Sequence, residues 1–205
     1  RAPLAAARSD PRFVQLVMRG PDLAPEWSAR QLCHVVWSLA ALQAVDRGGG
    51  ENVLLDAASQ EFSQRAVLEG VPQDISTFAW ALAVMSTHHS AALATIARCS
   101  MARISEFGMQ DLSITAWAFA KLLYQDRRPL LATIAQESLH KLPSFSGRNL
   151  ANLSWAFATA QQRDLTLSEA LVSQCAGRIH ELGPQELPIA LWSFAASGYP
   201  ADDVF

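Results

Sequence analysis

The sequence has few charged residues, only two tyrosines and no excess of basic residues. Lys and Arg number 16 against 19 Asp and Glu, which gives a formal net charge of -3. A protein that holds nucleic acid mainly through the phosphates normally carries a basic excess. The composition therefore argues against binding dominated by phosphate contacts, although it does not exclude nucleic acid.

Cysteine is also scarce, and no hydrophobic run is long. Cys33, Cys99 and Cys175 are far apart and form no CxxC pair, so neither a zinc site nor a disulfide framework is expected. We interpret them as buried, reduced thiols. No run approaches the ~20 apolar residues of a membrane-spanning helix. The sequence therefore predicts no metal site and no membrane partner.

A repeated tryptophan motif is present. Its five copies read VWSLA, AWALA, AWAFA, SWAFA and LWSFA, around Trp37, Trp80, Trp117, Trp155 and Trp192. These tryptophans are spaced 43, 37, 38 and 37 residues apart, and alanine follows each of them by three positions. Internal repetition at a period of 20 to 50 residues is typical of repeat proteins. Residues are numbered below from the tryptophan of their own repeat, so that position +3 is this alanine.

Each repeat contains two helical patterns joined by a polar turn, and we name them the first helix, which carries the tryptophan, and the second helix. First helices are predicted near 72–86, 109–123, 147–161 and 184–198. The longest tryptophan interval contains Gly48, Gly49 and Gly50, which predict a flexible loop.

A single hairpin of this kind cannot bury its own apolar surface, so neighbouring repeats must stack. We therefore predict an all-α fold, an α-solenoid of about five helical hairpins of about 38 residues each. The hairpins fill one domain, residues 1–205. The repeat units are 24–70, 71–107, 108–145, 146–182 and an incomplete 183–205, and we expect the chain to be part of a longer array.

The two faces of the first helix differ at about 100° per residue. Positions -5, -2, -1, +2 and +5 form an apolar face that we expect to pack against the second helix of the same repeat. The tryptophan lies on the other side with positions -7, -3 and +4. We interpret it as core, filling the junction between adjacent first helices, with Trp117 largely buried. The alternative is a platform on which bases stack.

No pattern of catalytic residues stands out. His88 and His89 fall in a turn and lack a carboxylate or cysteine that would complete a ligand set. Nothing pairs a nucleophile with a base, and no glycine-rich loop could cradle a phosphate. We predict a binding scaffold rather than an enzyme, without cofactor or small-molecule substrate.

The motif resembles a known family. The copies PQDISTFAWALA, MQDLSITAWAFA, GRNLANLSWAFA and PQELPIALWSFA are similar to the octotricopeptide repeat, which also occurs in FAST-kinase-like and RAP-domain proteins. They also resemble the helical repeat domain of RNA-editing substrate-binding complex subunit 6. The resemblance covers about residues 24–198, and the first copy, SARQLCHVVWSLA, departs from it because it lacks Pro-Gln.

The resemblance implies binding of single-stranded RNA in mitochondria or plastids, for transcript stability, processing, editing or translation, with protein partners in a ribonucleoprotein complex. Without the resemblance, a cytoplasmic location is expected.

The candidate RNA-binding residues lie beside the tryptophans. A solenoid that reads one base per repeat uses two or three side chains that differ between repeats. Position -7 carries Gln or Arg, position -3 varies, and Lys121 at position +4 could meet a phosphate. The candidates are Arg30, His34, Gln73, Thr77, Gln110, Lys121, Arg148, Asn152 and Gln185.

Two alternatives remain open at this point. The residues at position -7 could simply occupy solvated first turns of helices. The whole array could instead be a protein-interaction scaffold of the HEAT or armadillo kind. Charge separates the two functions, since an RNA groove should collect basic residues, and the first helices offer only Arg30, Lys121 and Arg148 there.

Overall fold

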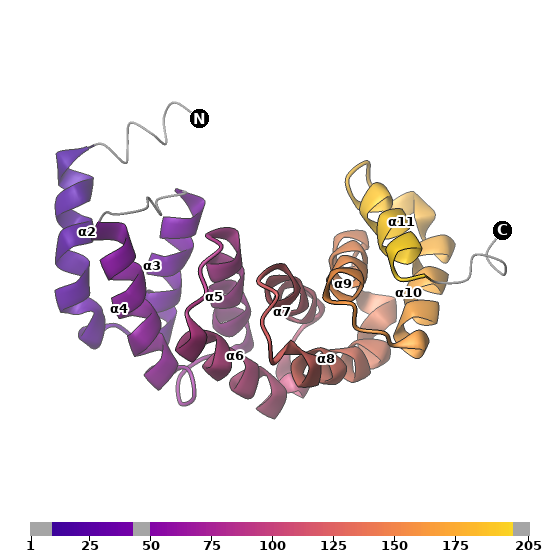
Figure 1. Cartoon of the computed structure of the whole chain (residues 1–205), viewed down its shortest axis with the longest axis horizontal. Coiled ribbons are helices and arrows are strands. Elements are labelled where there is room, and N and C mark those ends of the chain that lie inside the picture. The colour runs from indigo at the N-terminus through magenta and orange to yellow at the C-terminus, as the bar shows by residue number, and fades with distance from the viewer. Residues whose placement is uncertain (1–9, 43–49, 199–205) are drawn as a thin grey trace. The chain divides into compact units, whose positions relative to one another are not determined.

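The computed structural model describes residues 10–42 and 50–198 (Figure 1). These residues form helices, short 3-10 turns and loops, and no strand occurs among them. The predicted all-α class is confirmed. The contacts divide the chain into two compact units, Arg1–Cys99 and Ser100–Phe205.

The first unit contains α2 (Pro11–Leu23), the 3-10 turn η1 (Ala24–Glu26), α3 (Ala29–Ala41), α4 (Gly50–Arg65), α5 (Pro72–Val84) and most of α6 (Ser90–Ala102). Helix α3 packs against both α4 and α5, and α2 packs against α4. The predicted loop at Gly48 and Gly49 lies outside the described residues, whereas Gly50 is the first residue of α4.

The second unit contains η2 (Ile104–Glu106), α7 (Met109–Lys121), α8 (Arg127–Lys141), η3 (Leu142–Ser144), α9 (Gly147–Ala160), α10 (Leu165–Gly177), η4 (Ile179–Glu181) and α11 (Glu186–Ala196). Helix α7 packs against α9, and α9 against α11. Helices α8 and α10 pack against α7 and α9 respectively.

The helices follow the register of the tryptophan motif. Helices α3, α5, α7, α9 and α11 each contain one motif tryptophan and are the first helices, while α4, α6, α8 and α10 are the second helices. The four first helices predicted with ranges are observed within a few residues of those ranges. Consecutive first helices of one unit therefore pack side by side.

Local capping fixes where the first helices begin. In α3 the side chain of Gln31 accepts from the backbone N–H of Ser28 (2.8 Å), and the Ser28 hydroxyl oxygen accepts from the N–H of Gln31. This reciprocal capping satisfies two backbone donors that the first turn leaves without helical partners. Helix α5 instead begins with Pro72, whose missing N–H costs nothing there.

Large apolar side chains at positions -5 and +2 fill the core. In the first unit Phe78 of α5 stacks on Phe62 of α4, with ring centroids 3.9 Å apart, and both rings are fully buried. In the second unit the buried Phe119 meets the edge of Tyr124, with centroids 5.3 Å apart. The alanines at position +3 are buried in α3, α5, α7 and α9, as their small size suggested.

Four first helices end in a left-handed residue at position +6, and the sequence gave little sign of it. These residues are Ser86, Leu123, Gln161 and Gly198, with φ between 50° and 64°. In α7 the N–H of Tyr124 donates to the carbonyl of Phe119, and the N–H of Leu123 to that of Ala120. Such a cap normally uses glycine, because a β-carbon is strained in this conformation.

Replacing Leu123 with glycine is expected to stabilise the protein by about 0.5–1 kcal/mol. The left-handed conformation costs a non-glycine residue about 1–2 kcal/mol, and glycine returns part of that gain through a more flexible unfolded chain. Leu123 is mostly exposed, so little packing is lost. Urea titration of Leu123→Gly checks this result.

Gly198→Ala is the mirror control. A β-carbon there would have no neighbour within 4 Å, so its expected destabilisation is purely conformational. A Leu123→Gly protein less stable than its parent would show that the turn is not strained.

Basic residues of the second helices tie each repeat to the one before it. Lys141 donates from Nζ to the carbonyls of Ser105 (2.9 Å) and Phe107 (2.7 Å) and pairs with Glu137 (2.8 Å). Arg178 donates to the carbonyl of Pro143 in the same way. These ties satisfy carbonyls at the 3-10 turns that the helices leave open.

Candidate nucleic-acid interface

One line of side chains runs along the solvent-facing side of each first helix. It consists of positions -7, -3, 0 and +4, which lie within about 60° of one another on the helix surface. We call it the tryptophan stripe. In the first unit it comprises Arg30, His34, Trp37 and Ala41 on α3 and Gln73, Thr77, Trp80 and Val84 on α5. In the second unit it comprises Gln110, Ile114, Trp117, Lys121, Arg148, Asn152, Trp155, Thr159, Gln185, Ile189, Trp192 and Ala196.

The expectation that the tryptophans are core residues is wrong. Trp37 and Trp192 are 47% and 52% exposed. Trp80, Trp117 and Trp155 are partly exposed, and none of the five is buried. The core is complete without them, because Leu, Ile and Phe at positions -5 and +2 already fill it. Each ring instead lies over the surface of its helix and presents part of its face to solvent.

The rings of neighbouring repeats nevertheless meet in the second unit. Trp117 and Trp155 have centroids 6.1 Å apart and planes tilted by 37°. Lys121 holds its ammonium 4.9 Å from the Trp117 centroid, a cation–π distance. A base cannot enter between rings this close and tilted, since two stacking intervals of about 3.4 Å would be needed. The pair therefore forms a floor against which a planar ligand can lie.

The two arginines at position -7 are exposed, and each faces a carboxylate at position -6 of the next first helix. Arg30 Nε lies 3.7 Å from Asp74 in the first unit, and Arg148 Nε lies 3.7 Å from Glu186 in the second. Both guanidinium groups remain mostly exposed. The pairing reduces the charge available to a phosphate, which sequence reasoning did not foresee.

The remaining candidates also lie on the stripe. Gln73, Gln110 and Gln185 at position -7 are exposed, as are His34 and Lys121. Thr77 and Asn152 at position -3 are partly exposed beside their tryptophans. The structure thus brings the predicted residues to the surface of each unit, within reach of a ligand that lies across the rings.

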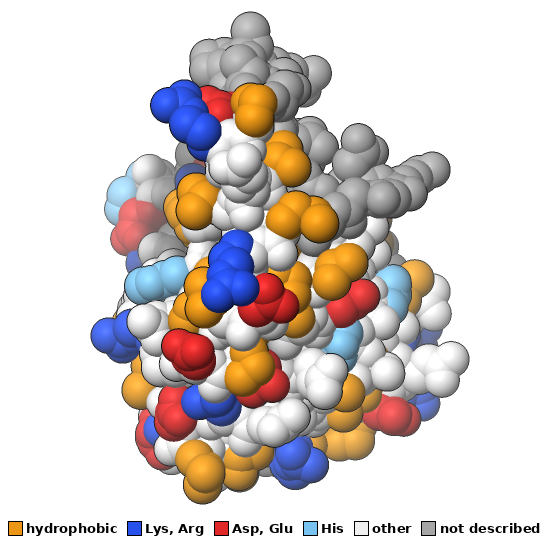
Figure 2. All heavy atoms as spheres, turned by 90° about the vertical axis from the view of Figure 1, so that its left-hand side faces the viewer, with side chains coloured by type: hydrophobic (Ala, Val, Ile, Leu, Met, Phe, Trp, Pro, Cys, Tyr) orange, Lys and Arg blue, Asp and Glu red, His pale blue; other side chains and the backbone are white. Residues whose placement is uncertain are grey.

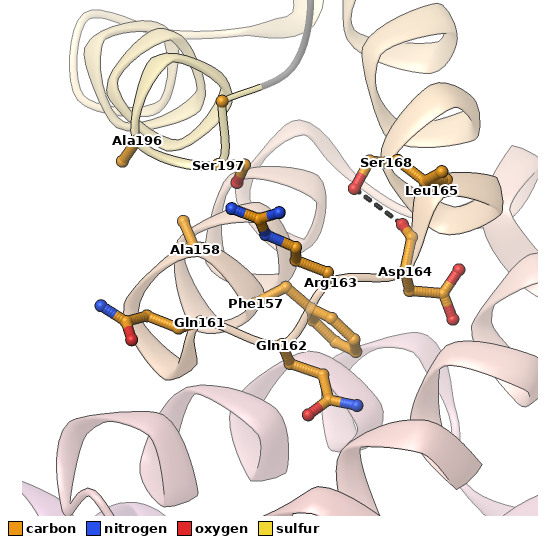
Figure 3. Close-up of a pocket in the computed structure, with 11 residues that line it drawn as sticks. Phe157, Ala158, Gln161, Gln162, Arg163, Asp164, Leu165, Ser168, Ala196 and Ser197 are labelled. Atoms are coloured by element: carbon orange, nitrogen blue, oxygen red, sulfur yellow. Dashed lines mark hydrogen bonds between the residues drawn. The ribbon is translucent and has the colours of Figure 1, made fainter.

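A hollow at the end of the stripe contains a basic residue that sequence reasoning missed. It has a volume of about 400 Å³ and lies between the end of α9, the following turn and the end of α11 (Figure 3). Arg163, at position +8, extends toward Ser197 across the hollow, and Gln161 and Gln162 line its other side. Position +8 continues the helical spacing of the stripe, and that signal could have identified Arg163.

Groups suited to other chemistry are not assembled. In the part of the chain that the structure describes, no three His, Cys, Asp or Glu side chains gather as metal ligands, and no helix is long and apolar enough to cross a membrane. The three cysteines are buried, and burial raises the pKa of Cys33 to about 12 and that of Cys175 to about 11. Both thiols are therefore protonated and poorly nucleophilic at neutral pH.

Comparison of the sequence with protein-family models gives no match, and comparison with curated proteins gives none either. The resemblance to octotricopeptide repeats therefore depends on the motif alone.

Proposed function

We propose that the protein is an α-solenoid that binds single-stranded RNA across the tryptophan stripe, as a scaffold without catalytic activity. A location in mitochondria or plastids, and a role in transcript stability, processing, editing or translation with ribonucleoprotein partners, are part of the proposal. They rest on the sequence resemblance.

The observation that carries the proposal is the partly exposed tryptophan at a fixed position of every first helix. The core does not need these rings, so their constant place at the surface is better explained by contact with a ligand. Aromatic side chains stack on bases of any identity, and each stacked base contributes roughly 1–3 kcal/mol. The neighbouring amides, hydroxyl and guanidinium groups differ between repeats, as base-reading side chains must.

The electrostatics define the binding mode. The ion pairs Arg30–Asp74 and Arg148–Glu186 leave few cations for phosphates, so stacking and hydrogen bonding to bases must supply most of the affinity. The same neutralisation would suit a protein ligand, and a protein-interaction scaffold of the HEAT or armadillo type is the second candidate. Salt dependence separates these functions, because only a phosphate ligand releases counterions when it binds.

The test is a titration of the chain with mixed-sequence single-stranded RNA at two salt concentrations, followed by fluorescence anisotropy. Two phosphate contacts on a single strand give a logarithmic salt slope of about -1.4. The double variant Arg30→Ala with Arg148→Ala is expected to bind several-fold more weakly, with a slope near zero. Glu186→Gln is expected to bind more tightly than the parent, with a steeper slope, because it releases Arg148.

The matched control is Arg98→Ala with Arg128→Ala, which removes the same charge from exposed positions on second helices. It should bind almost as the parent does. Equal affinity of the parent and the Arg30/Arg148 variant would remove these arginines from the RNA contact. No measurable binding by the parent would favour the protein-interaction scaffold.

A further inference from the structure

Helix α2 occupies the place of a second helix in the repeat register. The turn η1 lies 13 to 11 residues before Trp37, and η2, η3 and η4 lie at the same distance before Trp117, Trp155 and Trp192. Second helices pack against first helices of their own repeats, as α8 does on α7 and α10 on α9. Within the described residues, no first helix precedes α2.

A groove lies between α2 and α3, where such a first helix would pack. It has a volume of about 380 Å³ and a mostly apolar lining, formed mainly by Phe13, Leu16 and Val17 of α2 and Val35, Leu39 and Leu42 of α3. Leu16 is 73% exposed. Figure 2 views the molecule from the side of α2 and shows hydrophobic side chains exposed on this face. The groove is thus open to solvent and suited to an apolar helix face.

The α3 wall of the groove has the composition of a contact between first helices. Positions -2 and +1 are buried in α5, α9 and α11, for example Leu153 and Ala156 in α9. We had expected position -2 to contact the second helix of its own repeat. In α11, however, Ala190 is buried although no second helix follows within the described residues. Position -2 therefore faces the preceding repeat.

In α3 these same two positions are open. Val35 is partly exposed and Ser38 is exposed. The small side chain of Ser38 leaves room for the close approach that Ala81, Ala118, Ala156 and Ser193 permit in the other first helices. The groove therefore has the shape and the residues that would receive a further first helix.

Helix α11 presents the complementary surface. Position -1 is buried in α3, α7 and α9, as Val36, Ala116 and Ser154. Its counterpart on α11, Leu191, is 54% exposed. Helix α11 is a first helix that packs on the preceding repeat, while its opposite side is uncovered by any described residue.

We propose that α11 of one copy of this chain docks into the α2–α3 groove of a second copy. There α2 would take the place of the second helix for α11, and α3 that of the following first helix. The contact continues the packing that α7, α9 and α11 show within one unit. It would place two neutral amides together, Gln185 at position -7 and Gln31 at position -6, so no unpaired charge is buried. The proposal is independent of RNA binding.

The contact is heterologous, because each copy contributes a different surface, and this property gives the test. In sedimentation velocity the weight-average mass of the parent should rise with protein concentration. Leu16→Asp and Leu191→Asp each leave one surface intact, and both sites are largely exposed, so each variant should fold. Each should be monomeric alone, and an equimolar mixture should form a one-to-one dimer.

Leu68→Asp, at an exposed site outside the groove, is the matched control and should associate like the parent. Ser38→Arg, also at an exposed site, blocks the groove by size rather than charge and should be monomeric if Leu16→Asp fails to fold. A parent that stays monomeric at every concentration would overturn the proposal. So would single variants whose mixture does not associate, since that result indicates a symmetric contact.

Discussion

Phe119→Ala is expected to lower the free energy of unfolding by about 3–5 kcal/mol, the range for deleting a large aromatic side chain from a core. Phe119 is fully buried and packs edge-on against Tyr124. Its replacement leaves a cavity that the surrounding helices cannot close. Chemical denaturation followed by circular dichroism measures the loss.

Trp117, two residues earlier on the same helix, is the matched comparison. The ring is larger but partly exposed, and about half of that destabilisation is expected for Trp117→Ala. This order reverses what the repeat motif suggested. Equal destabilisation by the two substitutions would restore the tryptophan to the core.

Trp117→Ala combined with Trp155→Ala is expected to weaken binding of single-stranded RNA by at least tenfold. Each ring is proposed to support one base, and loss of a stacked base costs roughly 1–3 kcal/mol, or about 5- to 150-fold in affinity. The same anisotropy titration measures the effect. Circular dichroism establishes that the double variant retains its helices.

Trp27→Ala is the control for this variant. Trp27 is the sixth tryptophan and lies before α3, outside the tryptophan stripe. Its replacement should leave RNA affinity nearly unchanged. If the double variant and the parent bound RNA equally well, the rings would be structural and the proposed function would lose its main support.

The helices could be predicted from the sequence because three signals agree at each of them. The spacing of Trp80, Trp117, Trp155 and Trp192 gives the period, the apolar positions give the buried face, and polar or proline residues mark the helix starts. Such agreement across local and repeating patterns is the strongest basis for predicting a fold. The left-handed turns escaped prediction because Ser86, Leu123 and Gln161 stand where glycine would have marked them.

The surface stripe could be predicted, but its chemistry could be predicted only in part. Helical geometry puts positions -7 and -3 beside the tryptophan, and the structure places them there. Hydrophobicity suggested burial of the ring, yet burial depends on which neighbours fill the space, and here Leu112 and Phe119 fill it. The partners of Arg30 and Arg148 lie 44 and 38 residues away, so only the packing of neighbouring first helices shows that these charges are paired.

The chain has only two lysines, and the structure gives them opposite environments. The three ammonium protons of Lys141 are all engaged, by two carbonyls and a carboxylate. Lys121 is exposed and lies over Trp117. An amine-directed reagent will therefore distinguish the two side chains, and a fluorophore or crosslinker attached to Lys121 will sit on the tryptophan stripe itself. No residue has to be introduced to label this surface.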